Sequence, residues 1–149
     1  MKLCTASETI SFVKEFEEKS AQFYEALSQR HPKDKDLLQR YAKENRKYAS
    51  QIQRTYYSVI SDALEGCFAF DLEAEDFAFD TTPSEKADYS EALGQAVGME
   101  EKILAFYTKA AEQSMSLMAD VPRSFKIVVK KRKDRLPTLN RLARERTQK

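Results

Sequence analysis

The sequence predicts an all-α fold, an up-down four-helix bundle in which two antiparallel helix hairpins are joined by a long crossover. Three Gly and four Pro among 149 residues, with 33% of residues charged, favour long helices over turn-rich β structure. Apolar residues recur at helical spacing in four segments, and part of the first segment returns in the third. The length suits one domain, residues 1–149, with a sizeable core.

The first hairpin is predicted from residues 5–64. Thr5-Ala-Ser-Glu8 reads as a capping box, and apolar positions then continue at helical spacing to about Arg30. Residues 31–34, His-Pro-Lys-Asp, form a turn short enough to send the second helix back antiparallel. We expect that helix to run from about Asp34 to Leu64, with Gly66 as its stop.

The second hairpin follows a crossover that lacks a helical period, residues 66–82. Its phenylalanines are expected to cover one end or flank of the bundle: Phe68, Phe70, Phe77 and Phe79. The third helix can start at residues 82–85, Thr-Pro-Ser-Glu, and is continuous from Ser90 to about Ser114. Gly94 and Gly98 within it indicate a close helix contact.

The fourth helix is predicted after Val121-Pro122. Its inward positions are Phe125, Val128, Val129, Leu136 and Leu139. Because proline lacks an amide donor and its ring clashes with the preceding turn, Pro137 must kink or divide this helix. We expect an exposed basic C-terminal extension over about residues 137–149.

A repeated segment carries the candidate site. Residues 17–27, EEKSAQFYEAL, return as residues 100–110, EEKILAFYTKA, at a shift of 83. Helical spacing places Glu17 and Glu100 within apolar stripes, so two buried carboxylates are predicted. A buried carboxylate costs several kcal/mol unless it is paired, protonated or bound to a cation. The alternative is that each glutamate extends to the rim or makes a core salt bridge.

The paired Glu-x6-Tyr helices, 17–24 and 100–107, each followed by a partner helix, resemble the rubrerythrin group of ferritin-like proteins. The resemblance covers residues 8 to about 142. It implies a ferritin-like homodimer with a di-iron site that reduces peroxide. In such bundles two helices give one Glu each, and the other two give Glu-x-x-His each.

The resemblance assigns Glu17 and Glu100 to the single-glutamate positions. In the second helix Glu44 falls on the glutamate position and Lys47 on the histidine position. The fourth helix aligns with the second at a shift of 87, which puts Lys131 on the glutamate position and Asp134 on the histidine position. A slip of one residue puts Lys130 and Lys133 on these positions instead. Tyr24 and Tyr107 are expected to be core tyrosines that bond to this site. His31, the only histidine, lies in a turn, so a standard di-iron site is not predicted.

Two interpretations stay open. In the first, the four carboxylates are a vestigial site without a cofactor, Lys47 and Lys131 replace the metal in a buried Glu/Lys network, and the protein is non-catalytic, acting through binding or assembly. In the second, one iron or manganese ion lies on Glu17, Glu44 and Glu100, and the protein is a rubrerythrin-type oxidoreductase acting on peroxide. The chain has no CxxC pair for a rubredoxin module, so electrons would have to come from another protein, which favours the first interpretation.

Charge and hydropathy bound the partners and location. No apolar run near 18 residues and no signal-like N-terminus occur, so a cytoplasmic protein without membrane contact is expected. Residues 126–149 contain ten Lys and Arg against two acids, whereas residues 71–80 contain five acids and no base. No base-reading motif accompanies the basic segment, so a solvated helix, or contact with the acidic segment in a homodimer or within one chain, is expected over nucleic acid. A different protein partner is also open.

Overall fold

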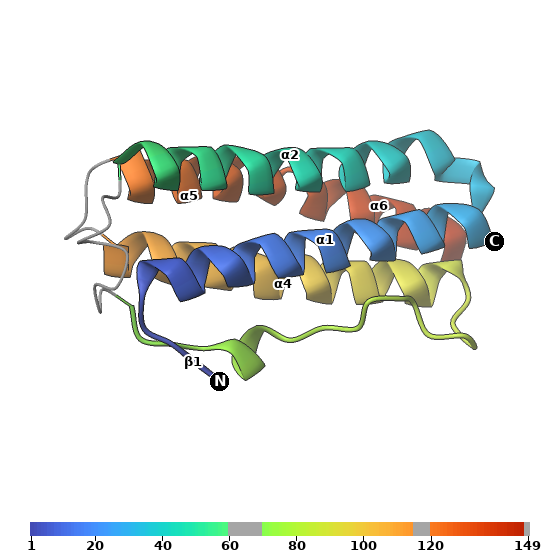
Figure 1. The fold of residues 1–149 in the computed structure, drawn as a ribbon. Coiled ribbons are helices and arrows are strands. Elements are labelled where there is room, and N and C mark those ends of the chain that lie inside the picture. Colours follow the sequence, from blue (N-terminus) through green and yellow to red (C-terminus); the bar gives the residue numbers. More distant parts are fainter. Residues whose placement is uncertain (60–69, 115–119, 148–149) are drawn as a thin grey trace.

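A computed structural model describes residues 1–59, 70–114 and 120–147 as a bundle of helices lying side by side (Figure 1). The helices are α1 (Ala6–Arg30), α2 (Lys35–Val59), α4 (Tyr89–Gln113), α5 (Asp120–Lys133) and α6 (Arg135–Thr147). Two 3₁₀ turns, η1 (Pro32–Asp34) and η2 (Ala74–Phe77), accompany them. Strands β1 (Lys2–Leu3) and β2 (Leu72–Glu73) form one short antiparallel ladder. The all-helical prediction is therefore confirmed apart from this ladder.

The first hairpin begins at the predicted capping box. The Thr5 side chain accepts from the Glu8 amide, and the Glu8 carboxylate accepts from the Thr5 amide. His31 and η1 then reverse the chain, and His31 stacks on Tyr89 with ring centroids 4.7 Å apart. The predicted helix end at Leu64 and the Gly66 stop lie outside the described residues.

The crossover runs back along the length of the bundle, so that α2 and α4 point in the same direction (Figure 1). Phe70 and Phe77 are buried on the flank, and Phe77 packs edge-on against Phe106 of α4 at 5.3 Å. Phe79 is partly buried and packs on the same core, while Phe68 is outside the described residues. The predicted cover over one flank is confirmed for the described phenylalanines.

The third helix begins later than residues 82–85 suggest. It starts at Tyr89, where the Asp88 side chain accepts from the Glu91 amide as an N-cap. The backbone groups of residues 83 and 84 are used elsewhere, because Arg30 donates to both carbonyls and the Ser84 amide donates to Gln95. The segment of residues 82–85 is therefore a loop that hydrogen-bonds to α1 and α4, and its prediction as a helix start is wrong.

The fourth helix is divided, as Pro137 requires. The break is at Asp134, between α5 and α6, which leaves Pro137 in the first turn of α6, where no intrahelical amide donor is needed. The basic side chains Arg141 and Arg144 are exposed, as predicted for this extension, but the segment is a packed helix and not a free tail. Helix α6 packs against α4, and Leu139 and Leu142 are buried.

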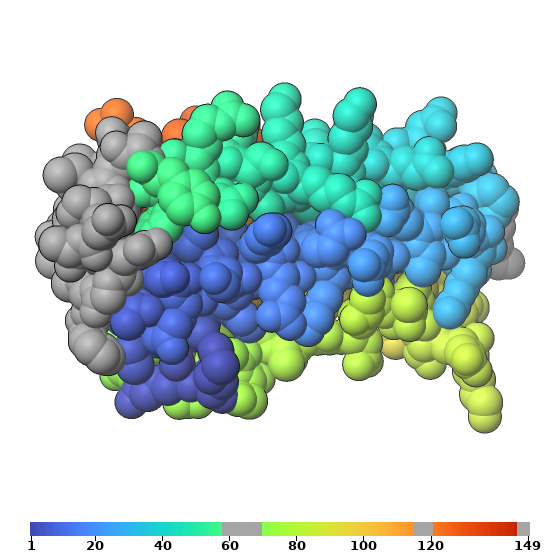
Figure 2. All heavy atoms as spheres, in the orientation of Figure 1, coloured from blue at the N-terminus to red at the C-terminus, as the bar shows by residue number. Residues whose placement is uncertain are grey.

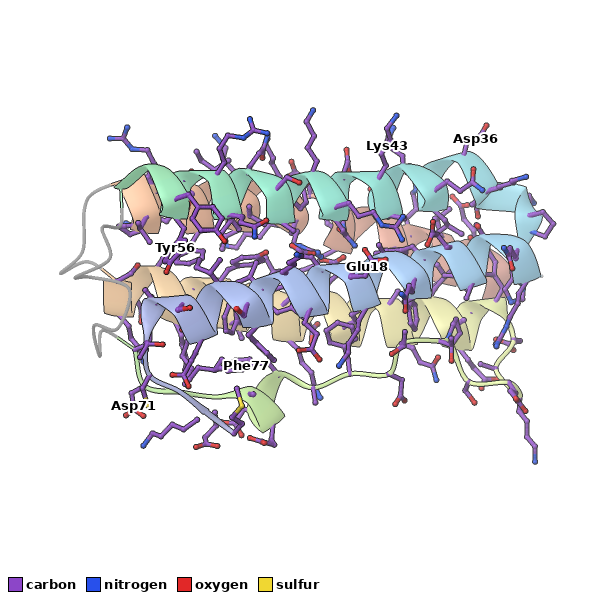
Figure 3. All side chains as sticks on the ribbon, in the orientation of Figure 1. Glu18, Asp36, Lys43, Tyr56, Asp71 and Phe77 are labelled. Atoms are coloured by element: carbon purple, nitrogen blue, oxygen red, sulfur yellow. The ribbon has the colours of Figure 1, made fainter. Side chains whose placement is uncertain are left out.

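One hydrophobic core joins the five helices of the described residues. Helix α1 packs on α2, α4 packs on α5 and α6, and α2 also meets α5. Figure 2 shows that the side chains of α1 and α2 pack against each other along the length of the two helices. Asp36 and Lys43 point outward from α2 in Figure 3, whereas Tyr56 is buried. Within the described ranges, no helix is long and apolar enough to cross a membrane.

Candidate functional site

The two repeat-related glutamates lie in the centre of the bundle. Glu17 on α1 and Glu100 on α4 are both 0% exposed, which confirms their predicted burial. The Tyr107 hydroxyl donates to Glu17 Oε2 at 2.5 Å, and the Tyr24 hydroxyl donates to Glu100 Oε1 at 2.6 Å. Each repeat thus supplies the tyrosine that binds the glutamate of the other repeat.

An arginine bridges the two carboxylates. Arg132, near the end of α5, is 0% exposed and donates from Nη1 to Glu100 Oε2 at 2.7 Å. Its Nη2 donates to Glu17 Oε1 and, at 3.0 Å, to Asn45 Oδ1. The planar guanidinium suits this arrangement because it presents several N–H donors in a fixed fork. Arg132 therefore stands between the two glutamates as their common partner.

A second arginine extends the cluster toward the surface. Arg135 begins α6, and its Nη1 donates to Glu100 Oε1 at 2.9 Å and to Asn45 Oδ1 at 2.7 Å. Its Nη2 donates to the Tyr41 carbonyl at 3.2 Å and to Glu44 Oε1 at 3.3 Å. The guanidinium carbon lies 4.4 Å from the centroid of the Tyr41 ring, a cation–π distance. We call Glu17, Glu100, Arg132, Arg135 and Asn45 the central network.

The predicted cations and one predicted acid are not in this network. Lys47, Lys131 and Asp134 are exposed, so the assignment of Lys47 and Lys131 as the groups that replace a metal is wrong. Glu44 reaches the edge of the network through Arg135, with 39% of its side chain exposed. The alternative slip to Lys130 and Lys133 is wrong as well, because both lysines are exposed.

The error has a simple geometric cause. The predicted shift of 87 pairs Leu38 with Phe125, Tyr41 with Val128, and Ile52 with Leu139, and all six side chains are buried. The same shift pairs Asn45 with Arg132 and Tyr48 with Arg135, all of them buried. The predicted ligand positions on the second and fourth helices were therefore one residue early, at Glu44 instead of Asn45 and at Lys131 instead of Arg132. The buried stripe itself contained the signal, since its members recur at steps of three and four residues.

The surroundings shift the two carboxyl groups in opposite directions. Burial raises the pKa of Glu17, and the opposing charge of Arg132 does not outweigh it. Burial also acts to raise the pKa of Glu100, but Arg132 and Arg135 together lower it below its ordinary value. Glu100 contacts both guanidiniums whereas Glu17 contacts only Arg132, which accounts for the difference.

The aromatic and guanidinium groups of the network keep their protons. Burial, followed by the neighbouring glutamate, raises the pKa of Tyr24 and Tyr107 well above the ordinary value. Burial acts to lower the pKa of Arg132, but the negative charges of Glu100 and Glu17 outweigh burial and raise this pKa above its ordinary value. The tyrosines are therefore hydrogen-bond donors at neutral pH, and Arg132 is a permanent cation.

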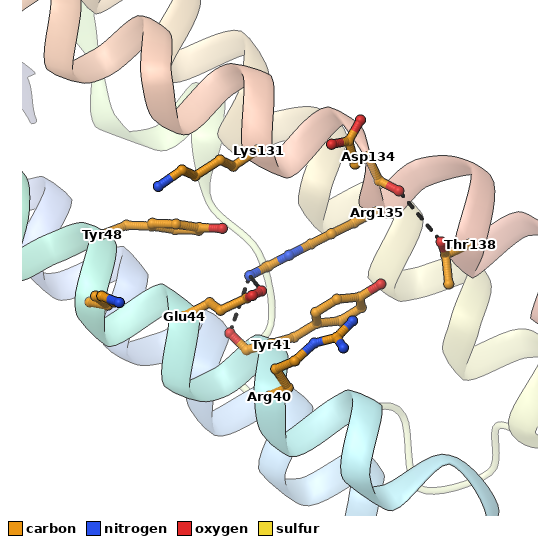
Figure 4. Close-up of a pocket in the computed structure, with 9 residues that line it drawn as sticks. Arg40, Tyr41, Glu44, Tyr48, Lys131, Asp134, Arg135 and Thr138 are labelled. Carbon is orange, nitrogen blue, oxygen red and sulfur yellow. Dashed lines mark hydrogen bonds and ion pairs between the residues drawn. The ribbon is translucent and has the colours of Figure 1, made fainter.

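A surface cleft of about 420 Å³ lies outside the network, between α2 and the α5–α6 break. Arg135 crosses it, with the Tyr48 ring toward one end and the Tyr41 ring toward the other (Figure 4). The remaining lining side chains are polar or charged: Arg40, Glu44, Lys47, Lys131, Asp134 and Thr138. Four of the six residues that were predicted to hold or replace the metal thus line the cleft, one layer outside Glu17 and Glu100: Glu44, Lys47, Lys131 and Asp134.

The donor set does not fit a di-metal centre. Oxygen atoms of Glu17 and Glu100 accept from Arg132, from Arg135 and from the two tyrosines. A divalent ion would have to displace fixed positive charge to reach them. Across residues 1–59, 70–114 and 120–147, no three His, Cys, Asp or Glu side chains gather as a set that could hold a metal ion.

Comparisons of the chain with protein-family models, with curated proteins and with solved structures return no match. The resemblance to rubrerythrin-type proteins remains an expectation that depends on the repeat at residues 17–27 and 100–110. Function is therefore inferred from the geometry of the central network and the cleft.

Proposed function

We propose that this chain is a ferritin-like bundle that works without a metal, in which arginine side chains take the electrostatic place of a di-metal centre. Its role is binding or assembly rather than catalysis. The distribution of inward polar positions supports the ferritin-like assignment. Helices α1 and α4 give one glutamate each, while α2 and the α5–α6 segment each give two buried residues three apart, Asn45 and Tyr48, and Arg132 and Arg135. In di-metal carboxylate bundles, two helices likewise give one ligand each and the other two helices give two ligands three residues apart.

The bridge from Arg132 to both Glu17 and Glu100 is the observation that carries the proposal. Two carboxylates and two guanidiniums sum to zero charge, so the buried cluster is neutral without a metal ion. A guanidinium does not lose its proton in proteins. At an effective dielectric of about 20, it would repel each unit of metal charge at ~4 Å by about 4 kcal/mol.

The proposal is tested by metal content and by peroxide turnover on the same preparation. Protein purified without chelator is measured by inductively coupled plasma mass spectrometry, before and after incubation with ferrous iron or manganese. We expect no stoichiometric metal in any sample, and no peroxide consumption above that of the same iron in buffer. Stoichiometric metal that disappears in Glu17→Gln, or peroxide turnover that requires Glu17, would instead establish the oxidoreductase.

A further inference from the structure

We propose that the cleft between α2 and the α5–α6 break binds a small hydroxylated organic phosphate of the sugar-phosphate class. The inference adds a ligand to the non-catalytic role proposed above, and it requires only that the central network hold Arg135 in place. Its phosphate lies at the Tyr48 end, between Lys47 and Lys131, and its hydroxyl groups face Asp134 and Thr138. Four features of the cleft carry this assignment: cations without ion-pair partners, a fixed buried guanidinium, side-chain oxygens that can accept hydrogen bonds, and volume.

The cleft collects cations that have no anionic partner of their own. Arg40 and Lys47 on α2 and Lys131 on α5 all line it, and within the described part of the chain none of them makes an ion pair. Lys131 Nζ lies 5.9 Å from the centroid of the Tyr48 ring, and Lys47 precedes Tyr48 in the chain. Two lysines from different helices therefore flank one end of the cleft. Such convergent unpaired ammonium groups suit a phosphate, to which they bind as point charges.

Arg135 gives the cleft a fixed positive centre. Only 3% of its side chain is exposed, and Glu44, Glu100, Asn45 and the Tyr41 carbonyl hold its terminal nitrogens. Its Nε has no hydrogen-bond partner among the described residues. Because the guanidinium is held before any ligand arrives, little conformational entropy is lost when an anion binds beside it.

Charge balance points to an anion. The charge of Arg135 is already balanced within the central network, so the other lining side chains carry three positive charges, on Arg40, Lys47 and Lys131, against two negative charges on Glu44 and Asp134. The cleft therefore keeps an excess of one positive charge. A phosphate monoester carries close to two negative charges at neutral pH, which Lys47 and Lys131 together can balance.

The remaining polar groups and the volume indicate what is attached to the phosphate. The Asp134 carboxylate has no ion-pair partner among the described residues and can accept hydrogen bonds from hydroxyl groups, as can the Thr138 hydroxyl. A cleft of about 420 Å³ is larger than a single oxyanion requires and falls in the size range of small-molecule sites.

The experiment is an NMR titration of the full chain at constant ionic strength, which removes differences in screening. Glucose 6-phosphate, inorganic phosphate and glucose are the three probes. We expect saturable shifts with glucose 6-phosphate at amides around Tyr48 and Arg135, weaker binding of inorganic phosphate, and none of glucose. No saturable binding of glucose 6-phosphate would overturn the proposal. Inorganic phosphate binding equally well would overturn the assignment of the hydroxyl groups.

Two double variants with equal charge change separate the cleft from general surface charge. Lys47→Gln with Lys131→Gln removes cleft cations, while Lys43→Gln with Lys133→Gln removes exposed lysines from the same two helices outside the cleft. We expect the first pair to weaken glucose 6-phosphate binding by about tenfold or more, and the second pair to leave it within about twofold. Equal weakening by both pairs would contradict a built site. Metal binding, measured separately, would refute the proposed function and leave this titration interpretable.

Discussion

Tyr107 on α4 donates its hydroxyl hydrogen to Glu17 on α1, 90 positions earlier in the chain, at 2.5 Å. Tyr24 makes the reciprocal bond to Glu100. The repeated Glu-x6-Tyr segments are thus interlocked, since each one completes the hydrogen bonding of the other. This explains why glutamate and tyrosine recur together at the same spacing in both helices.

Removing these hydroxyls should destabilise the bundle by unequal amounts. Among the described residues, Tyr107→Phe leaves Arg132 as the only side chain that donates to Glu17, and we expect it to cost about 1–3 kcal/mol. Tyr24→Phe should cost less, because Glu100 keeps both guanidiniums. Urea unfolding at neutral pH measures both values. Tyr57→Phe is the control, since Tyr57 is 67% exposed. A loss no greater than that of the control would contradict the interlocked arrangement.

Two arginines that each bridge two glutamates offer a matched comparison of buried and exposed ion pairs. Arg46 on α2 forms ion pairs with Glu18 and Glu25 on the exposed face of α1, each at 2.9 Å. We expect Arg46→Met to cost at most about 1 kcal/mol, because exposed pairs are screened by water and salt.

Arg132→Met should cost about 3–5 kcal/mol, because it leaves two buried carboxylates without their common partner. Arg132→Lys should restore only part of this loss, since one ammonium lacks the planar fork that reaches both glutamates. Chemical denaturation of the three variants under one set of conditions gives the comparison. Similar losses for Arg46→Met and Arg132→Met would show that the central network does not carry the stability inferred for it.

The opposite pKa shifts of the two central glutamates predict opposite pH dependence. The pKa of folded Glu100 lies below its ordinary value of 4.5, so its charge stabilises the fold above that pH, and the contribution is lost as the pH falls. The penalty of Glu100→Gln should therefore shrink between neutral pH and pH values below 4.5.

For Glu17 the folded pKa is raised, so wild-type protein loses stability as the pH rises through that value. Glu17→Gln cannot ionise, and its penalty relative to wild type should decrease on going from acid to neutral pH. Free energies of unfolding for wild type and both variants, measured across this range, decide the matter. Slopes of the same sign would mean that the two carboxylates do not differ in their coupling to Arg135.

Two glycines in α4 provide a stabilising test. The sequence indicated a close helix contact at Gly94 and Gly98, but a Cβ atom at either position would meet nothing within 4 Å. That interpretation is wrong, and both glycines weaken the helix without a packing gain. Gly94→Ala and Gly98→Ala should each stabilise the protein by about 0.5–1 kcal/mol, because alanine has the higher helix propensity. Thermal unfolding checks this expectation, and destabilisation by either substitution would reveal an unseen contact.

Helical periodicity predicted the bundle and the burial of Glu17 and Glu100, because both residues lie on stripes where their neighbours are apolar. It could also have found Arg132 and Arg135, which continue the stripe of Phe125 and Val128. The Glu-x-x-His pattern selects Glu44 over the neighbouring Asn45, and the shift of 87 then leads to Lys131 and Asp134 in place of Arg132 and Arg135. An arginine in a helix is usually a surface residue, and only its partners on other helices make it a buried one.

The cleft and the packing of α6 were beyond the sequence for a different reason. Residues 126–149 contain ten basic residues against two acids, which resembles a solvated tail, and the number of charges conceals the buried position Leu142 beyond the predicted inward Leu139. Whether Lys47 and Lys131 share a cleft depends on how α2 meets α5 in space, and neither helix contains that information alone. Local patterns determine which face is buried, whereas shared sites depend on how the helices pack together.

Ferrous iron stoichiometry of a register variant tests most directly whether arginines stand where metal ligands would. Asn45→Glu, Tyr48→His, Arg132→Glu and Arg135→His together give the ligand pattern of a di-metal bundle at the buried positions. Lys47→His with Lys131→Glu, at the exposed positions, is the matched control. We predict iron binding by the four-residue variant and none by wild type or the control. Iron bound by wild type or by the control, or a folded four-residue variant that binds no iron, would contradict the proposed replacement of metal by Arg132 and Arg135.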